Sequence, residues 1–244
     1  RAMLAPHFVM TIRESLTEKF GEKMVEEGGL KVITTLDYEK QQVAEKAVQE
    51  WGKKNVSMNA QNAALASLDT KTGEVLVMVG SKDYFDESID GNVNVTLRRR
   101  QPGSSFKPIV YAQGFIKGYT PRTIIYDLET NFNTDPAQKD YTPHNYTGKE
   151  YGPVTMKQAL AGSLNIAAVK TLYLAGVRNV IELAKNMGYD SLGGPDDYGL
   201  ALVLGGAEVT LLEHTAAFGA FAQDGVVARP VMIKRIEDKD GVIL

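Results

Sequence analysis

The hydrophobic pattern changes along the chain from strand-like to helix-like and back to strand-like. Two β-type apolar runs flank a polar turn at residues 69–73, which is typical of a β-hairpin. Helical spacing begins near residue 103 and lasts to about residue 224, and residues 231–236 alternate again as a strand. This order predicts an α+β fold in which a helical cluster packs on an antiparallel sheet.

A smaller segment precedes the hairpin and has its own pattern. Residues 13–27 predict a helix that stops at glycine, and residues 30–36 are rich in β-branched residues and predict a strand. Asp37 then has the character of an N-cap for a second helix. We therefore expect a small α+β module at residues 1–58, followed by a larger domain at residues 59–244.

Composition excludes several classes of protein. The 244 residues carry 27 Lys and Arg against 30 Asp and Glu, so a basic nucleic-acid-binding face is not expected. Cysteine is absent, which excludes disulfides, thiol catalysis and thiolate metal sites. The three histidines, His7, His144 and His214, are widely spaced, so a His-rich metal site is not expected. We also expect no cofactor. No apolar run approaches the roughly 18 residues of a membrane span.

Ser104 and Lys107 form an S-x-x-K motif at a loop-to-helix junction. Residues three apart share a helix face, and a serine hydroxyl needs a base within reach before it can act as a nucleophile. A lysine that burial keeps neutral can be that base. Pro102 and Gly103 predict a helix that starts at Ser104. The motif alone leaves open a solvent-facing serine and lysine without a catalytic role.

Two shorter motifs belong to the same chemistry. Ser163 and Asn165 form an S-x-N between two helical stretches, where a simple turn is the alternative explanation. A second S-x-N at residues 57–59 shows how common the pattern is. The K-T-G at residues 71–73 lies in the predicted hairpin turn and before the serine. In enzymes that combine these three motifs, S-x-x-K comes first, a Ser-Asp-Asn-type motif second and K-T-G last. We therefore interpret this copy as a turn without a catalytic role.

The segment RQPGSSFKPIVY at residues 100–111 resembles the active-serine segment of class A penicillin-binding proteins. These bifunctional enzymes polymerise and cross-link bacterial peptidoglycan. Other segments resemble the same proteins in the same order, namely residues 29–37, 64–80, 143–146, 152–160 and 204–213. The resemblance implies the penicillin-binding transpeptidase fold, which is similar to that of serine β-lactamases. It also implies that residues 1–58 are an interdomain linker module and residues 59–244 a partial transpeptidase domain.

The resemblance implies a catalytic role for four residues. Ser104 would attack the carbonyl of the penultimate D-alanine of a stem peptide and release the terminal D-alanine. Lys107 would take the serine proton, and Ser163 would relay a proton to the leaving amine. Asn165 would hydrogen-bond the peptide amide of the substrate. An amino group of a neighbouring stem would then receive the acyl group.

The resemblance also implies binding residues and partners. Ser105, Asn145 and Tyr146 would bind substrate. The partners would be stem peptides on lipid II-derived strands and β-lactam antibiotics, which would acylate Ser104. No nucleic acid is expected among them.

The resemblance further implies parts outside these residues. We expect a K-T-G strand after Leu244, which makes the domain incomplete at its C-terminus, and a glycosyltransferase domain and membrane anchor upstream. The chain would work at the extracytoplasmic face of the bacterial membrane.

Two other functions stay open at this stage. The missing K-T-G strand allows a non-catalytic module that binds peptidoglycan or β-lactam or acts as a scaffold. A β-lactam hydrolase is less favoured, because its second motif is Ser-Asp-Asn and Leu164 stands at the middle position here.

Overall fold

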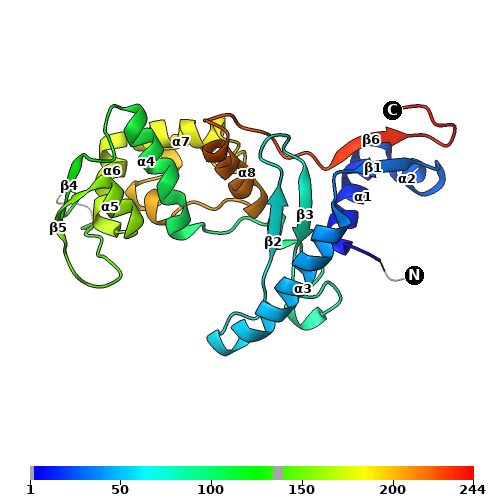
Figure 1. The fold of residues 1–244 in the computed structure, drawn as a ribbon, viewed down its shortest axis with the longest axis horizontal. Coiled ribbons are helices and arrows are strands. Elements are labelled where there is room, and N and C mark those ends of the chain that lie inside the picture. Colours follow the sequence, from blue (N-terminus) through cyan, green and yellow to red (C-terminus); the bar gives the residue numbers. More distant parts are fainter. Residues whose placement is uncertain (1–2, 134–139) are drawn as a thin grey trace. The chain divides into compact units, whose positions relative to one another are not determined.

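The computed structural model describes residues 3–133 and 140–244, which fall into two compact units. The first unit comprises Arg1–Arg99 together with Thr210–Leu244, and the second comprises Arg100–Val209. The helices and strands of the first unit are α1 (Pro6–Phe20), α2 (Glu22–Glu27), β1 (Lys31–Thr34), α3 (Tyr38–Asn55), β2 (Leu65–Leu68), β3 (Val75–Val79), α8 (Leu211–Ala222) and β6 (Ile233–Glu237) (Figure 1).

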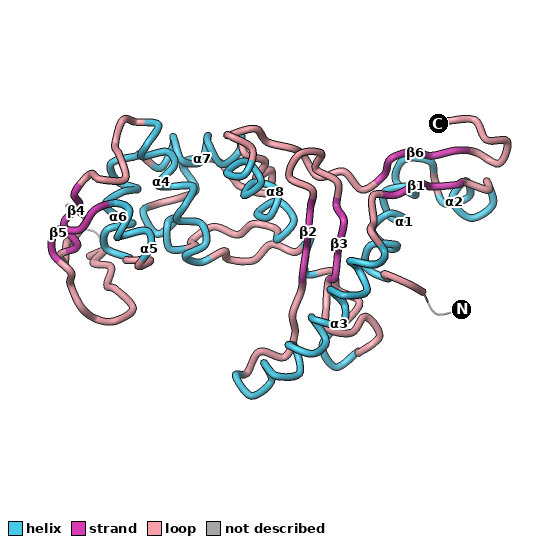
Figure 2. Tube along the Cα trace, viewed as in Figure 1, coloured by secondary structure: helices cyan, strands magenta, loops and turns pink. Residues whose placement is uncertain are grey.

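The second unit holds most of the predicted helical cluster. Its helices and strands are α4 (Lys107–Ile116), β4 (Ile124–Asp127), β5 (Gly152–Thr155), α5 (Met156–Ala161), α6 (Asn165–Ala175) and α7 (Val177–Asn186) (Figure 2). A capping box at Thr155 begins α5, because the threonine hydroxyl and the Gln158 side chain each pair with the other residue's backbone N–H. The helix that leads to the S-x-N segment therefore starts where the sequence predicts it.

The strands of the described residues form three antiparallel pairs, β1 with β6, β2 with β3, and β4 with β5. The α+β prediction is therefore confirmed, with small two-stranded sheets. The β2–β3 hairpin turns at residues 69–73, where Gly73 has a φ of 76°. Lys71 and Thr72 donate their backbone N–H groups to Asp69 Oδ1, so the predicted hairpin turn contains the K-T-G segment.

The core of the first unit joins segments that are far apart in the sequence. Helix α1 buries Phe8, Ile12 and Leu16 in a cluster that also contains Met78 of β3 and Ile236 of β6. Residues of the predicted linker module thus share a core with the hairpin and with the last strand. The domain boundary at residue 58 stays a prediction.

The prediction of a single helix over residues 13–27 is wrong in one respect. This segment contains parts of two helices, α1 and α2, which are separated by Gly21 with a φ of 81°. A glycine adopts such a conformation without a Cβ clash, so the chain can turn there. The strand and the Asp37-capped helix that follow are present as β1 and α3.

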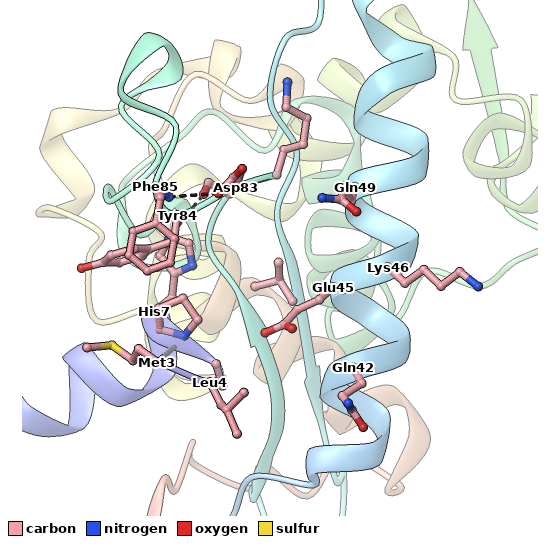
Figure 3. Close-up of a pocket in the computed structure, with 15 residues that line it drawn as sticks. Met3, Leu4, His7, Gln42, Glu45, Lys46, Gln49, Asp83, Tyr84 and Phe85 are labelled. Carbon is pink, nitrogen blue, oxygen red and sulfur yellow. Dashed lines mark hydrogen bonds between the residues drawn. The ribbon is translucent and has the colours of Figure 1, made fainter. Parts of the chain in front are cut away.

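The first unit also contains a cavity of about 430 Å³. The start of α1, one side of α3 and the segment after β3 line it, with His7, Glu45 and Tyr84 among its residues (Figure 3). His7 is buried and hydrogen-bonds the Gly91 carbonyl through Nε2, and burial lowers the pKa of its imidazole. No residue with a predicted catalytic role lines this cavity.

Helix α6 lies at the centre of the second unit. Most of its residues are buried, including Ile166, Ala168, Val169 and Leu172. Helices α4 and α7 pack against it, and Tyr173 lies on its exposed side. The segment that begins α6 is consequently held on a rigid element.

Among the residues that the structure describes, no helix combines the length and hydrophobicity that a bilayer crossing requires.

Candidate active site

Ser104 lies in a 3₁₀ helix, Gly103–Phe106, that runs directly into α4. The sequence predicts an α-helix from Ser104, whereas the α-helix begins at Lys107 and the 3₁₀ turn precedes it. In 3₁₀ geometry residues three apart eclipse one another, so Ser104 and Lys107 share a face. Gly103 has a φ of 57°, and Pro108 occupies the first turn of α4, where its missing N–H is tolerated.

The Lys107 side chain is buried and surrounded by oxygen atoms of one segment. Its Nζ donates to the Ser163 carbonyl at 2.6 Å, to Asn165 Oδ1 at 2.7 Å and to Ser163 Oγ at 3.2 Å. The residue is only 1% exposed, and all three ammonium protons have a partner. Ser163 and Asn165 lie 56 and 58 positions after Lys107 in the sequence, so the two motifs meet at the lysine nitrogen.

The segment around Ser163 connects α5 to α6 in an unusual conformation. Ser163 has a φ of 51°, a region that non-glycine residues seldom adopt. In this conformation both the carbonyl and the hydroxyl of Ser163 accept hydrogen bonds from Lys107. Non-glycine residues held at positive φ concentrate at functional sites, where packing maintains them.

Burial sets the protonation of Lys107. Desolvation lowers the pKa of its amine from 10.5 to about 8. A lysine with such a pKa is partly neutral near neutral pH and can accept a proton. In the part of the chain that the structure describes, no carboxylate forms an ion pair with Lys107.

Ser104 itself is exposed, and its carbonyl accepts the N–H of Lys107. Among the described residues, no hydrogen bond joins Ser104 Oγ to Lys107 Nζ. Catalytic hydrogen bonds are often long before substrate binds. The arrangement combines an accessible hydroxyl, a lysine of lowered pKa on the same face and a second hydroxyl bound to that lysine, which suits acyl transfer through a serine.

The family model of the penicillin-binding protein transpeptidase domain matches residues 63–242. The chain belongs to this family. Penicillin-binding protein 1A of Aquifex aeolicus is 41% identical over 182 residues, which cover 74% of this chain and 24% of that protein. Penicillin-binding protein 2D of Bacillus subtilis is 34% identical over 98% of this chain and 34% of its own length. The chain thus spans about a quarter to a third of these relatives.

Solved structures agree on the fold. Penicillin-binding protein 1A from Haemophilus influenzae superposes with a TM-score of 0.84 at 22% identity, and the match covers 98% of this chain and 49% of that one. The PonA1 protein from Mycobacterium tuberculosis, determined in complex with penicillin V, gives a TM-score of 0.82 at 21% identity over 98% of this chain and 64% of its own. The penicillin-binding transpeptidase fold that the sequence resemblance implies is confirmed.

The three predicted substrate-binding residues of this penicillin-binding domain differ in exposure. Tyr146 is fully exposed, and Ser105 is exposed with its hydroxyl donating to the Pro102 carbonyl at 2.5 Å. Asn145 is buried. Its Oδ1 accepts the N–H groups of Asn165 and Ile166, and its Nδ2 donates to two other protein oxygens. Substrate binding by these residues stays a prediction.

Two residues of the site were not found by sequence reasoning. Asp127 is fully buried at the end of β4, and it accepts three N–H groups of this region. Gly205 has a φ of 91°, and a Cβ there would lie 2.4 Å from the backbone nitrogen of Gly103, beside Ser104. An acidic residue after an apolar run and a Gly-Gly pair are the only signals that the sequence offers for them.

Proposed function

We propose that this chain carries the acyl-enzyme chemistry of a peptidoglycan D,D-transpeptidase. The observation that supports it best is the placement of Lys107 Nζ within hydrogen-bonding distance of both Ser163 and Asn165. Lys107, one turn of helix after Ser104, meets there two residues of the second motif, which lie 56 and 58 positions later in the chain. A solvent-facing lysine without a role would have neither this burial nor a lowered pKa.

In the first half-reaction Lys107, as the neutral amine, takes the proton of Ser104 Oγ. The oxygen attacks the carbonyl carbon of the penultimate D-alanine, and an Oγ–C bond forms. The C–N bond to the terminal D-alanine breaks, and the proton on Lys107 reaches the leaving nitrogen through the Ser163 hydroxyl. The backbone N–H of Ser104 donates a hydrogen bond to the carbonyl oxygen and stabilises its negative charge.

In the second half-reaction an amino group of a neighbouring stem peptide attacks the ester carbon. An N–C bond forms and the Oγ–C bond breaks. The proton of the attacking nitrogen passes through the Ser163 hydroxyl to Lys107, which delivers it to Ser104 Oγ. Asn165 Nδ2 donates one hydrogen to the His144 carbonyl at 3.0 Å, and its second hydrogen is the donor for the substrate amide. The same first step would open the ring of a β-lactam, with Ser104 Oγ attacking the lactam carbonyl carbon.

By analogy with the relatives, the chain would act at the extracytoplasmic face of the membrane.

Covalent labelling with a fluorescent penicillin tests this function. We expect one label per chain in the wild type and none in Ser104→Ala. Ser57→Ala is the matched control, because Ser57 belongs to the other S-x-N segment and lies in the first unit. Its label should equal that of the wild type.

The two other candidate functions give different results in the same assay. A folded wild-type chain that takes no label would overturn the proposal and favour a non-catalytic binding module. Label that forms and is then lost within minutes as hydrolysed penicillin would favour a β-lactam hydrolase. Stable label supports the transpeptidase.

A further inference from the structure

The first turn of α6 has its free N–H groups satisfied from outside the helix. The N-cap residue Leu164 offers no side-chain acceptor. Instead, Asn145 Oδ1 accepts the N–H of Asn165 at 2.7 Å and that of Ile166 at 3.3 Å. Asp127 Oδ1 accepts the next N–H, that of Ala167, at 3.1 Å. Side chains 20 and 40 residues earlier in the chain thus replace the usual cap.

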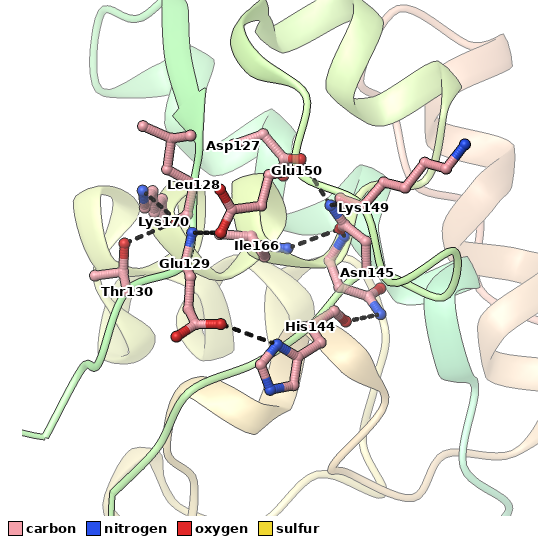
Figure 4. A network of polar contacts seen from close by, with 11 residues as sticks. Asp127, Leu128, Glu129, Thr130, His144, Asn145, Lys149, Glu150, Ile166 and Lys170 are labelled. Carbon is pink, nitrogen blue, oxygen red and sulfur yellow. Dashed lines mark hydrogen bonds and ion pairs between the residues drawn. The ribbon is translucent and has the colours of Figure 1, made fainter.

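Asn145 can hold this position because both ends of its amide are engaged (Figure 4). Its Nδ2 donates to Asp127 Oδ2 at 2.6 Å and to the Lys149 carbonyl at 2.9 Å. An amide has two donor hydrogens and an acceptor oxygen with two lone pairs, and here all four are used. The orientation of the amide is therefore set by Asp127, which alone offers it a charged acceptor.

Asp127 is the buried end of this chain of contacts. Its carboxylate is fully buried and receives three donors, Asn145 Nδ2, the Ala167 N–H and the Tyr151 N–H at 3.1 Å. A negative charge beside a helix N-terminus is also favoured by the helix dipole. Both carboxylate oxygens accept hydrogen bonds here, whereas the amide of an asparagine would offer only one acceptor oxygen.

The contacts continue from Asn145 to the catalytic lysine. Asn165 is fixed by its backbone N–H on Asn145 and by its Nδ2 on the His144 carbonyl, and these bonds point its Oδ1 at Lys107 Nζ. Ser163, two residues earlier, holds the same nitrogen from its positive-φ conformation.

From this arrangement we infer that Asp127 is a positioning residue for the acylation step, acting through Asn145 and Asn165 to hold Lys107 where it deprotonates Ser104. The inference rests on the proposed function. It assigns to Asp127 no contact with substrate.

Asp127→Asn is the sharpest variant, because it is isosteric and places an NH₂ group against converging donors. A misplacement of about 1 Å can cost on the order of 10²-fold in rate. In stopped-flow acylation by penicillin V, we expect the rate constant at saturation to fall about 10- to 100-fold. The dissociation constant of the non-covalent complex and the burst amplitude per folded chain should stay the same.

Two controls separate positioning from loss of stability. Asp196→Asn makes the same chemical change at a largely exposed carboxylate of the second unit, and it should leave all values unchanged. Val180→Ala opens the buried core of α7, so it should lower stability and leave the saturating rate per folded chain intact. If Asp127→Asn behaves like Val180→Ala, the inference is wrong. If Asp127→Asn does not fold, Asp127→Glu keeps the charge with a longer stem and should show a smaller loss of the same rate constant.

A second readout does not depend on activity. In the wild type, NMR titration of ¹³C-labelled lysine should give Lys107 a pKa near 8. When Asp127→Asn loosens the segment that excludes water, this pKa should rise toward 10.5. An unchanged pKa in that variant would overturn the inference even if the wild type takes no penicillin. Absence of labelling with the expected pKa change would instead overturn only the proposed function.

Discussion

At the scale of single residues, acylation of Ser104 depends on the protonation of Lys107. Its pKa is lowered by burial, and its three hydrogen-bond partners are uncharged. A buried ammonium without a carboxylate partner loses its proton more readily than an exposed one. This is the property that a general base for a serine hydroxyl requires.

The pH dependence of acylation follows from that pKa. Below about pH 8 the amine is mostly protonated and cannot accept the serine proton, so the rate should rise with pH and level off above 8. Lys107→Ala should lower the rate by about 10²- to 10⁴-fold and remove the inflection. Acylation rates measured from pH 6 to 10 test both statements. A wild-type profile that is flat across this range would exclude Lys107 as the base.

The residues of the site differed in how far the sequence could predict them. Ser104 with Lys107, and Ser163 with Asn165, are close in sequence, so their motifs are visible as short spacings. Asp127 is one of 30 acidic residues, and only packing in three dimensions buries it. Its role involves residues 18 to 40 positions away, which no local pattern encodes.

At the scale of elements, the site depends on where α4 and α6 begin. Helix α6 could be located from its apolar pattern and the preceding capping box, whereas the 3₁₀ turn before α4 could not. The turn there is shaped by Gly205, whose backbone approaches that of Gly103. Close backbone contacts between distant loops leave little trace in a sequence beyond a glycine.

Gly205→Ala tests this contact. Its Cβ would lie 2.4 Å from Gly103 N, and its φ of 91° disfavours any side chain, so the segment that carries Ser104 must shift. We expect the free energy of unfolding to fall by about 1–3 kcal/mol and acylation to slow. Gly199→Ala is the matched control, since a Cβ there meets no atom within 4 Å and φ is −108°. Equal acylation rates in the two variants would contradict the account.

At the scale of the whole molecule, the first unit ties the two ends of the chain together. Strand β1 pairs with β6, and Thr35 Oγ1 donates to the Val75 carbonyl of β3 at 2.7 Å. The sequence predicts β1, β3 and β6 as strands, but it does not give the pairing of β1 with β6. Partners about 200 residues apart follow from the fold and not from local propensity.

Phe8→Ala tests how strongly the N-terminal helix supports the hairpin. Phe8 is 1% exposed within the cluster of α1, β3 and β6. Its removal should lower the free energy of unfolding by about 3–5 kcal/mol in urea titrations. Val9→Ala, at an exposed neighbour on the same helix, should change it by less than about 0.5 kcal/mol. A small effect of Phe8→Ala would mean that α1 contributes little to this core.

Acylation of Ser104 is the step on which the proposed function depends, and peptide mapping by mass spectrometry detects it at the residue itself. After incubation with penicillin V, we expect one added penicilloyl group per chain, on the peptide that contains Ser104 and Lys107. The same treatment of Ser104→Ala should leave every peptide unmodified. An adduct on another serine, such as Ser163, or no adduct on the folded wild-type chain would contradict the account.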